Sequence, residues 1–350
     1  MAHELTLRRD GRYEMAFVGD TPWHGLGQPM VKGASLEDWR KAAGMDWEAQ
    51  NGTPLVEHHT PLGSREPLFF DDYKALYRSD TLGCLAIVGK DYQVVQPADV
   101  MEFFRDLTES GGWHIHTAGT MRGGRKLWAM ATCEDAVQYV RGYKGDQVAL
   151  NLLLATSMDG SMQTTAMLTS VRVVCANTLR MALESGSHAQ VKLTHRSTFD
   201  AGIIKQVLGV DAAQRTFGKF MADAKRMAET PISLGDARDV LLRIFKPSNA
   251  LAKPNLSWLT DNLAELDTQV PEPQDSRATG RILEMFDGAG RGADLKTAKG
   301  TRWGLLNAVT EYVDHEMGRT PDTRLDAAWF GRGRDFKQQA LQLLTEEVTA

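Results

Sequence analysis

The sequence has few of the features that support disulfide, zinc or membrane-spanning structures. Its three cysteines are widely spaced and never form a C-x-x-C pair, so neither a disulfide framework nor a zinc knuckle is predicted. Apolar runs such as residues 148–155 stop well short of the roughly 20 residues that cross a bilayer, and no basic-then-apolar leader is visible. We therefore expect a cytoplasmic protein in a reducing compartment, with no membrane partner.

The motifs of several enzyme classes are missing as well. No G-x-S-x-G elbow is present, and Cys175 ends an apolar segment where we expect a buried, unreactive thiol. Residues 119–126 are rich in glycine but lack the G-x-x-x-x-G-K-[ST] spacing, which excludes a P-loop there. The sequence thus predicts no catalytic residue and no cofactor.

Histidines are the first candidates for a metal site, but their spacing favours structural roles. His114 and His116 alternate along one expected strand without a Cys or carboxylate at a helpful spacing. His58 and His59 are consecutive in an expected loop, and His24 lies in a Trp-His-Gly-Leu-Gly turn where packing of the tryptophan is the simpler interpretation. We predict no metal site.

The order of hydrophobic patterns predicts an α+β fold. Period-2 runs extend from about residue 67 to 175, and period-3.6 runs dominate from 177 onward. A helix from 97 to about 110 interrupts the strands, so we expect a curved antiparallel sheet with an interrupting helix, followed by a largely helical C-terminal region. The expected strands cover residues 67–73, 76–78, 85–89, 92–95, 113–118, 127–133, 147–157 and 163–175.

The helical pattern sets the expected domain organisation. Further helices are expected at residues 35–43, 177–185, 198–229, 234–245, 278–287, 301–317 and 335–348. We expect an N-terminal segment (1–60), a basic β-rich core domain (61–200) and a helical C-terminal region (201–350). Four prolines between residues 246 and 275 indicate an extended linker inside the last part.

Positive charge gathers in the middle of an otherwise acidic chain. The formal net charge is -5, yet residues 113–205 hold ten Lys or Arg against six Asp or Glu. Cations on glycine-flanked hairpins suit phosphate contacts, which need charge and a curved surface rather than a base-reading motif. Trp113, Trp128, Tyr139 and Tyr143 are interleaved with them and could stack on unpaired bases, unless the tryptophans are core residues. The residues expected to contact nucleic acid are Arg122, Arg125, Lys126, Arg141, Lys144, Arg172 and Lys192.

Several stretches resemble a known family. They are W-H-G-L-G at 23–27, V-R-V-V-C-A-N-T-L at 171–179 and N-A-V-T-E-Y-V-D-H at 307–315. Together with residues 328–331 and the helix expected over 337–344, they resemble the phage/plasmid-like proteins grouped as domain of unknown function 932. The resemblance implies an origin in mobile elements and assigns no catalytic residue.

The expected order of elements is also similar to that of the single-strand annealing proteins of phage recombination. These proteins form rings or filaments that hold single-stranded DNA without ATP. The similarity is architectural and shares no motif. It implies a single-stranded DNA binding and annealing protein in the host cytoplasm, with DNA and further copies of the chain as partners. The alternatives are a phage protein that binds a host protein through its carboxy-terminal helices, and a metal-dependent nucleic-acid enzyme.

Overall fold

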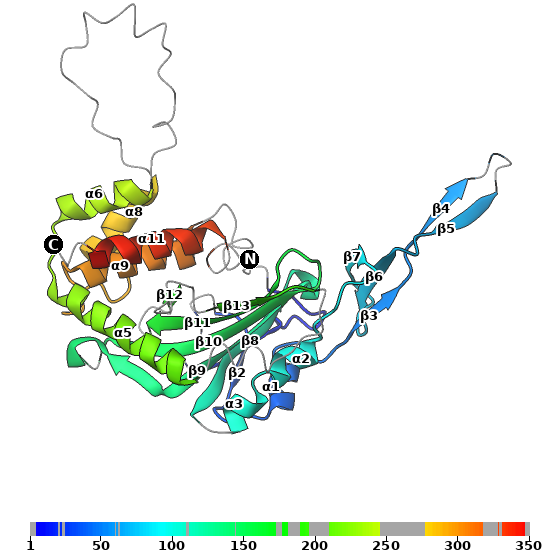
Figure 1. Cartoon of the computed structure of the whole chain (residues 1–350), viewed down its shortest axis with the longest axis horizontal. Coiled ribbons are helices and arrows are strands. Elements are labelled where there is room, and N and C mark those ends of the chain that lie inside the picture. The colour runs from blue at the N-terminus through cyan, green and yellow to red at the C-terminus, as the bar shows by residue number, and fades with distance from the viewer. Residues whose placement is uncertain are drawn as a thin grey trace, which may run out of the picture. The chain divides into compact units, whose positions relative to one another are not determined.

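The computed structural model describes residues 5–19, 22, 25–59, 61, 64–109, 112–143, 145–172, 177–180, 190–195, 210–245, 277–317, 328 and 331–346. The chain divides into two compact units (Figure 1). One comprises residues 1–138, 148–220 and 320–325, and the other comprises residues 139–147, 221–319 and 326–350. Strands dominate the first unit and helices the second, which confirms the expected α+β class.

An eight-stranded sheet forms the body of the first unit. Its strands are β1 (Met15–Val18), β2 (Gln28–Met30), β8 (Trp113–Met121), β9 (Lys126–Tyr139), β10 (Gln147–Ser157), β11 (Thr164–Arg172), β12 (Asn177–Arg180) and β13 (Gln190–Leu193). They follow the order β12-β11-β10-β9-β8-β1-β2, and β13 pairs with the other half of β11. β1 and β2 pair in parallel, whereas β8 is antiparallel to β1 and β9, and β11 is antiparallel to β10, β12 and β13.

The central strand β10 explains where the core of this sheet lies. Residues 148–157 are all buried, so the strand is covered on both faces, and its sequence V-A-L-N-L-L-L-A-T-S is mostly apolar. Its buried side-chain amide, Asn151, accepts a hydrogen bond from Thr132 on β9 and donates one to the Ala149 carbonyl. The buried polar group is therefore satisfied inside the sheet.

Three short helices, two smaller sheets and the amino-terminal part of α5 (Val210–Glu229) also belong to the first unit. The helices are α1 (Leu36–Ala42), α2 (Pro97–Glu102) and α3 (Arg105–Glu109). β3 (Ala49–Gly52), β6 (Tyr73–Arg78) and β7 (Cys84–Gly89) form a three-stranded antiparallel sheet. β4 (Leu55–His59) and β5 (Arg65–Phe69) form a two-stranded ribbon that extends beyond it (Figure 1).

Several local expectations hold, and others are wrong. Ser35 caps α1 as predicted, with its Oγ accepting a hydrogen bond from the Asp38 N–H at 3.1 Å. The helix expected over 97–110 is divided between α2 and α3, and the strand expected over 92–95 is a loop whose Gln93 N–H bonds the His195 carbonyl instead of a neighbouring strand. The helix expected from residue 177 begins as strand β12, because pairing with β11 overrides the local helical pattern.

Helices build the second unit. They are the carboxy-terminal part of α5 (Val210–Glu229), α6 (Leu234–Ile244), α8 (Arg277–Glu284), α9 (Arg302–Glu311) and α11 (Arg332–Glu346), with π-helical turns η4 (Met285–Ala289) and η5 (Tyr312–Glu316). α9 and η5 are continuous and carry the N-A-V-T-E-Y-V-D-H stretch. None of the described helices is long and apolar enough to cross a membrane.

The α9–η5 helix is tied to its neighbours by ion pairs. Lys337 on α11 donates to Asp314 at 2.6 Å, and both side chains are less than a tenth exposed, at 4% and 7%. Arg281 on α8 donates two hydrogen bonds to Glu316, each at 2.8 Å. Acidic residues of the α9–η5 helix thus fix the positions of α8 and α11, so the α9–η5 helix has a structural role in the second unit.

Two histidines on β8 have a shifted protonation equilibrium. Burial lowers the pKa of His116, and the nearby His114 lowers it further. Burial also lowers the pKa of His114, with a further lowering by Lys32, and Glu134 opposes this without reversing it. The neutral form of both imidazoles is therefore more favoured in the folded chain than in the unfolded chain.

A pH-dependent loss of stability follows. The folded pKa values lie below the unfolded value of about 6.5. The part of the folding stability that depends on neutral imidazoles is therefore fully present above that pH and is lost as the pH falls through the folded pKa values. Urea unfolding followed at pH 7.5 and pH 5.5 should show lower stability at the lower pH. The His114→Gln/His116→Gln variant should lose less than the parent over this interval, and an equal loss in both would refute the assignment.

Candidate nucleic-acid interface

The turn between β8 and β9 presents two of the expected basic residues. Arg122 and Arg125 are both exposed, and Gly123 and Gly124 lie between them. Arg122, Gly123 and Gly124 have φ angles of 55°, 71° and 93°, so three consecutive residues are in the left-handed region that disfavours side chains with a Cβ. A non-glycine residue held in this conformation indicates that the surrounding structure fixes the turn.

Gly124 shows what holds the turn in place. A Cβ at this position would lie 2.8 Å from the Trp47 ring and 3.2 Å from Nη1 of Arg78. The backbone of the turn therefore rests directly on these two side chains. Substitution of this glycine would displace either the turn or the aromatic ring.

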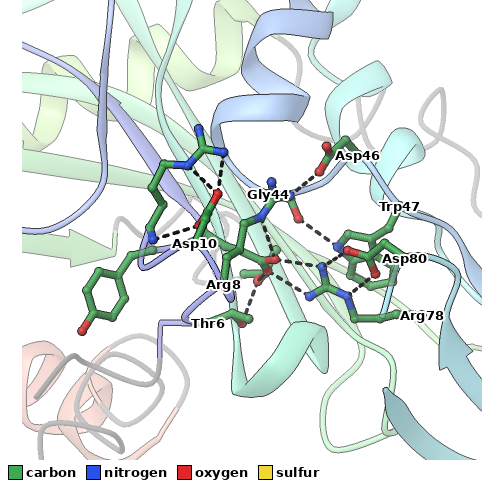
Figure 2. Close-up of polar contacts among 12 residues, drawn as sticks. Thr6, Arg8, Asp10, Gly44, Asp46, Trp47, Arg78 and Asp80 are labelled. Atoms are coloured by element: carbon green, nitrogen blue, oxygen red, sulfur yellow. Dashed lines mark hydrogen bonds and ion pairs between the residues drawn. The ribbon is translucent and has the colours of Figure 1, made fainter. Parts of the chain in front are cut away.

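Arg78 is the centre of a buried polar cluster beneath the turn (Figure 2). Its guanidinium donates two hydrogen bonds to Glu14, at 2.8 and 3.0 Å, and two to Asp80, at 2.7 and 2.9 Å. Its Cζ lies 4.4 Å from the centre of the Trp47 ring, within range of a cation–π interaction. Burial alone lowers the pKa of Arg78, but the hydrogen bonds with Asp80 and Glu14 outweigh it, and the pKa is raised.

Glu14 joins this cluster to the amino-terminal segment and to β8. Its carboxylate also accepts hydrogen bonds from Arg8 Nε, at 3.1 Å, and from the Thr120 hydroxyl. Two glycines allow the close approach: a Cβ at Gly44 would lie 2.4 Å from Cγ of Glu14, and one at Gly119 would lie 2.7 Å from its carbonyl oxygen. The cluster thus connects segments that are far apart in the sequence.

A second turn lies beside the first at the same end of the sheet. The Met158 N–H, at the start of the β10–β11 turn, donates to the Arg125 carbonyl at 2.7 Å. Lys192 on β13 is exposed and lies opposite Thr165, in the first part of β11. The strand order β9-β10-β11-β13 separates the first turn from Lys192 by three strand spacings, about 14 Å. We call Arg122, Arg125 and Lys192 the basic rim.

Two charged residues next to the rim do not add to its exposed positive charge. Lys126, the first residue of β9, is only 3% exposed, so its ammonium is not presented to solvent. Asp159 in the β10–β11 turn places a negative charge nearby: burial raises its pKa, but hydrogen bonds from Ser161 outweigh this, and the pKa is lowered. The rim is therefore a small cationic site with an acidic neighbour.

The remaining predicted residues are not in the rim. Arg141 follows the other end of β9, belongs to the second unit and pairs there with Glu229 at 3.6 Å. Its hairpin is anchored in that unit by Asp146, which is fully buried and accepts a hydrogen bond from Trp303 Nε1 at 3.0 Å. Arg172 is the last residue of β11, paired with Val148, and Lys144 lies outside the described residues.

The aromatic residues divide between core and surface. Trp113 and Trp128 are 6% and 2% exposed, which makes them core residues of the sheet. Tyr139 and Tyr143 are 38% and 39% exposed. The two exposed residues of this set, Tyr139 and Tyr143, therefore flank Arg141 in the sequence and are not part of the rim.

A metal site finds no support in the described part of the chain. No group of three or more His, Cys, Asp or Glu residues there is arranged to hold an ion. His58 and His59 are consecutive in β4, not in a loop, and so point to opposite faces of the ribbon. His24 and Cys175 lie outside the described residues.

The comparison with known families gives a match over most of the chain. Residues 84–329 match the family described as "Domain of unknown function (DUF932)". The chain belongs to this family. No curated protein and no solved structure matches the chain. The matched range contains the basic rim and the α9–η5 helix, whereas Glu14, Trp47 and Arg78 of the buried cluster lie before it.

The buried cluster should dominate the stability of the first unit. Arg78→Met leaves the Glu14 carboxylate buried without its main partner, and breaking a buried ion pair typically removes about 3–5 kcal/mol. Glu14→Gln/Arg78→Met, which removes both charges, should be less destabilised than Arg78→Met alone. Urea unfolding of the variants measures this, with Arg105→Met, an exposed ion-paired arginine, as the control. Equal stability of Arg78→Met and the parent would contradict the role of the cluster.

Proposed function

We propose that this protein binds single-stranded DNA through the basic rim and that several copies act together on one strand to anneal it, without ATP. The observation that supports this most directly is the β8–β9 turn, in which Arg122 and Arg125 are exposed on a backbone fixed by the Trp47–Arg78 contact. On the sequence resemblance, the proposal includes a phage or plasmid origin and a role in recombination.

The chemistry of the rim favours phosphate contacts that do not depend on sequence. Guanidinium groups donate paired hydrogen bonds to phosphate oxygens and keep their charge at all physiological pH values. A fixed turn loses little conformational freedom when it binds, so more of the interaction energy appears as affinity. A flexible single strand can follow a row of turns, whereas reading a duplex requires an element that enters a groove.

The small size of the rim explains why copies should act together. Three exposed cations release few counterions, so one copy alone should bind weakly and with a shallow salt dependence. Linking several rims along one strand raises the overall affinity without any new contact, because each further binding event becomes intramolecular. The proposal therefore includes self-association.

A charge-matched pair of variants tests this function. Arg122→Ala/Arg125→Ala/Lys192→Ala should weaken binding of a fluorescent oligothymidylate, and the salt slope should fall by about 2, at roughly 0.7 for each lost phosphate contact. The control, Arg12→Ala/Lys41→Ala/Arg105→Ala, removes three cations that pair with Asp10, Glu37 and Glu102. It has the same net charge and should bind like the parent.

Three outcomes would count against the proposal. Equal losses in the two triple variants would show that only net charge matters. An unchanged salt slope in the rim variant would exclude these residues as phosphate contacts. Absence of binding by the parent chain at low salt would refute the function itself.

A further inference from the structure

The β4–β5 ribbon exposes apolar side chains on both faces. Leu55 lies opposite Phe69, and Val56 lies opposite Leu68. Since successive residues of a strand point to opposite faces, each face carries one of these apolar pairs. The four side chains are 50% to 54% exposed. Soluble proteins seldom expose apolar side chains in such a group unless the surface binds a partner.

The two edges of the ribbon differ in protection. β5 contains Pro67, which has no N–H and hinders the addition of another strand, as well as the charged Arg65. β4 reads L-V-E-H-H: it has no proline, and its only charged carboxylate or ammonium side chain is Glu57. A two-stranded ribbon is also only marginally stable in water. The β4 edge is therefore the one suited to pairing.

Charge and size define the kind of partner. Residues 55–73 contain one Arg and four Asp or Glu, a balance that repels phosphates and excludes nucleic acid. Half-exposed aromatic residues such as Phe69 and Tyr73 present on the order of 100 Å² each. Leu55, Val56 and Leu68 add further exposed apolar area, which is divided between the two faces of the ribbon. The fitting partner is a protein.

We propose that this partner is a second copy of the chain, joined through antiparallel pairing of the two β4 strands about a two-fold axis. Such pairing covers both unprotected edges at once and leaves the two proline-containing β5 strands as the outer edges of a four-stranded sheet. It also aligns the same faces of the two ribbons, so Val56 and Leu68 of one copy lie on the same face of the joint sheet as Val56 and Leu68 of the other. Most homo-oligomers use closed two-fold contacts of this kind. This inference rests on the self-association included in the proposed function and names its surface.

Cysteine cross-linking tests the geometry. Val56→Cys, Glu57→Cys and His58→Cys are made one at a time in a Cys84→Ser background, because Cys84 is exposed. At a two-fold axis one of these cysteines meets its own copy within disulfide distance, so mild oxidation should give a covalent dimer that is strongest at one β4 position. Glu66→Cys, which is exposed on β5, is the control and should give no covalent dimer. Equal cross-linking on both strands, or none on β4, would overturn the proposal.

A charge variant tests the energetics and separates the two proposals. Leu55→Lys/Val56→Lys should fold like the parent, since both positions are exposed, and should weaken self-association by about tenfold or more in sedimentation analysis without DNA. The rim triple variant should dimerise like the parent while losing DNA affinity. A parent chain that is monomeric and binds DNA would overturn the β4 interface and the self-association, but not DNA binding through the rim, whereas a dimeric parent that does not bind DNA would overturn the DNA-binding function alone.

Discussion

The ion pair between Arg78 and Glu14 is the interaction on which the first unit depends. Its two side chains are 4% and 1% exposed, so neither charge can be solvated by water if the other is lost. The pair joins β6 to the segment before β1, and Thr120 and Trp47 bring in β8 and the residues after α1. One buried contact therefore connects four parts of the chain that no local pattern would bring together.

The β8–β9 turn gives this cluster a link to function. Because Gly124 lies directly on Trp47 and Arg78, the orientation of the exposed Arg122 and Arg125 depends on buried groups beneath them. Fixing a binding turn from below is how preorganised sites gain affinity with few contacts. In the second unit a comparable buried pair, Lys337 with Asp314, holds helices together.

The sequence predicted the fold class and most elements because their signals are local. Ser35 before α1, the apolar run of β10 and the glycines of the β8–β9 turn each specify structure within a few neighbours. The prediction of a helix from residue 177 was wrong because these residues pair with β11, and strand pairing is a long-range effect. The cluster was not predicted, since Glu14 and Arg78 are 64 residues apart and each reads as an ordinary surface charge. The place of Lys126 in a basic hairpin also could not show that its side chain is buried.

The most direct test of the account is the DNA affinity of Gly124→Ala. This substitution keeps every charge, but its Cβ would lie 2.8 Å from the Trp47 ring, so it displaces the turn from the cluster. Gly123 also has a positive φ, and a Cβ added there would meet no atom within 4 Å. Gly123→Ala is therefore the control for backbone strain alone. The account predicts that Gly124→Ala binds oligothymidylate clearly more weakly than Gly123→Ala. Equal affinity of the two variants would show that the buried cluster does not position the rim.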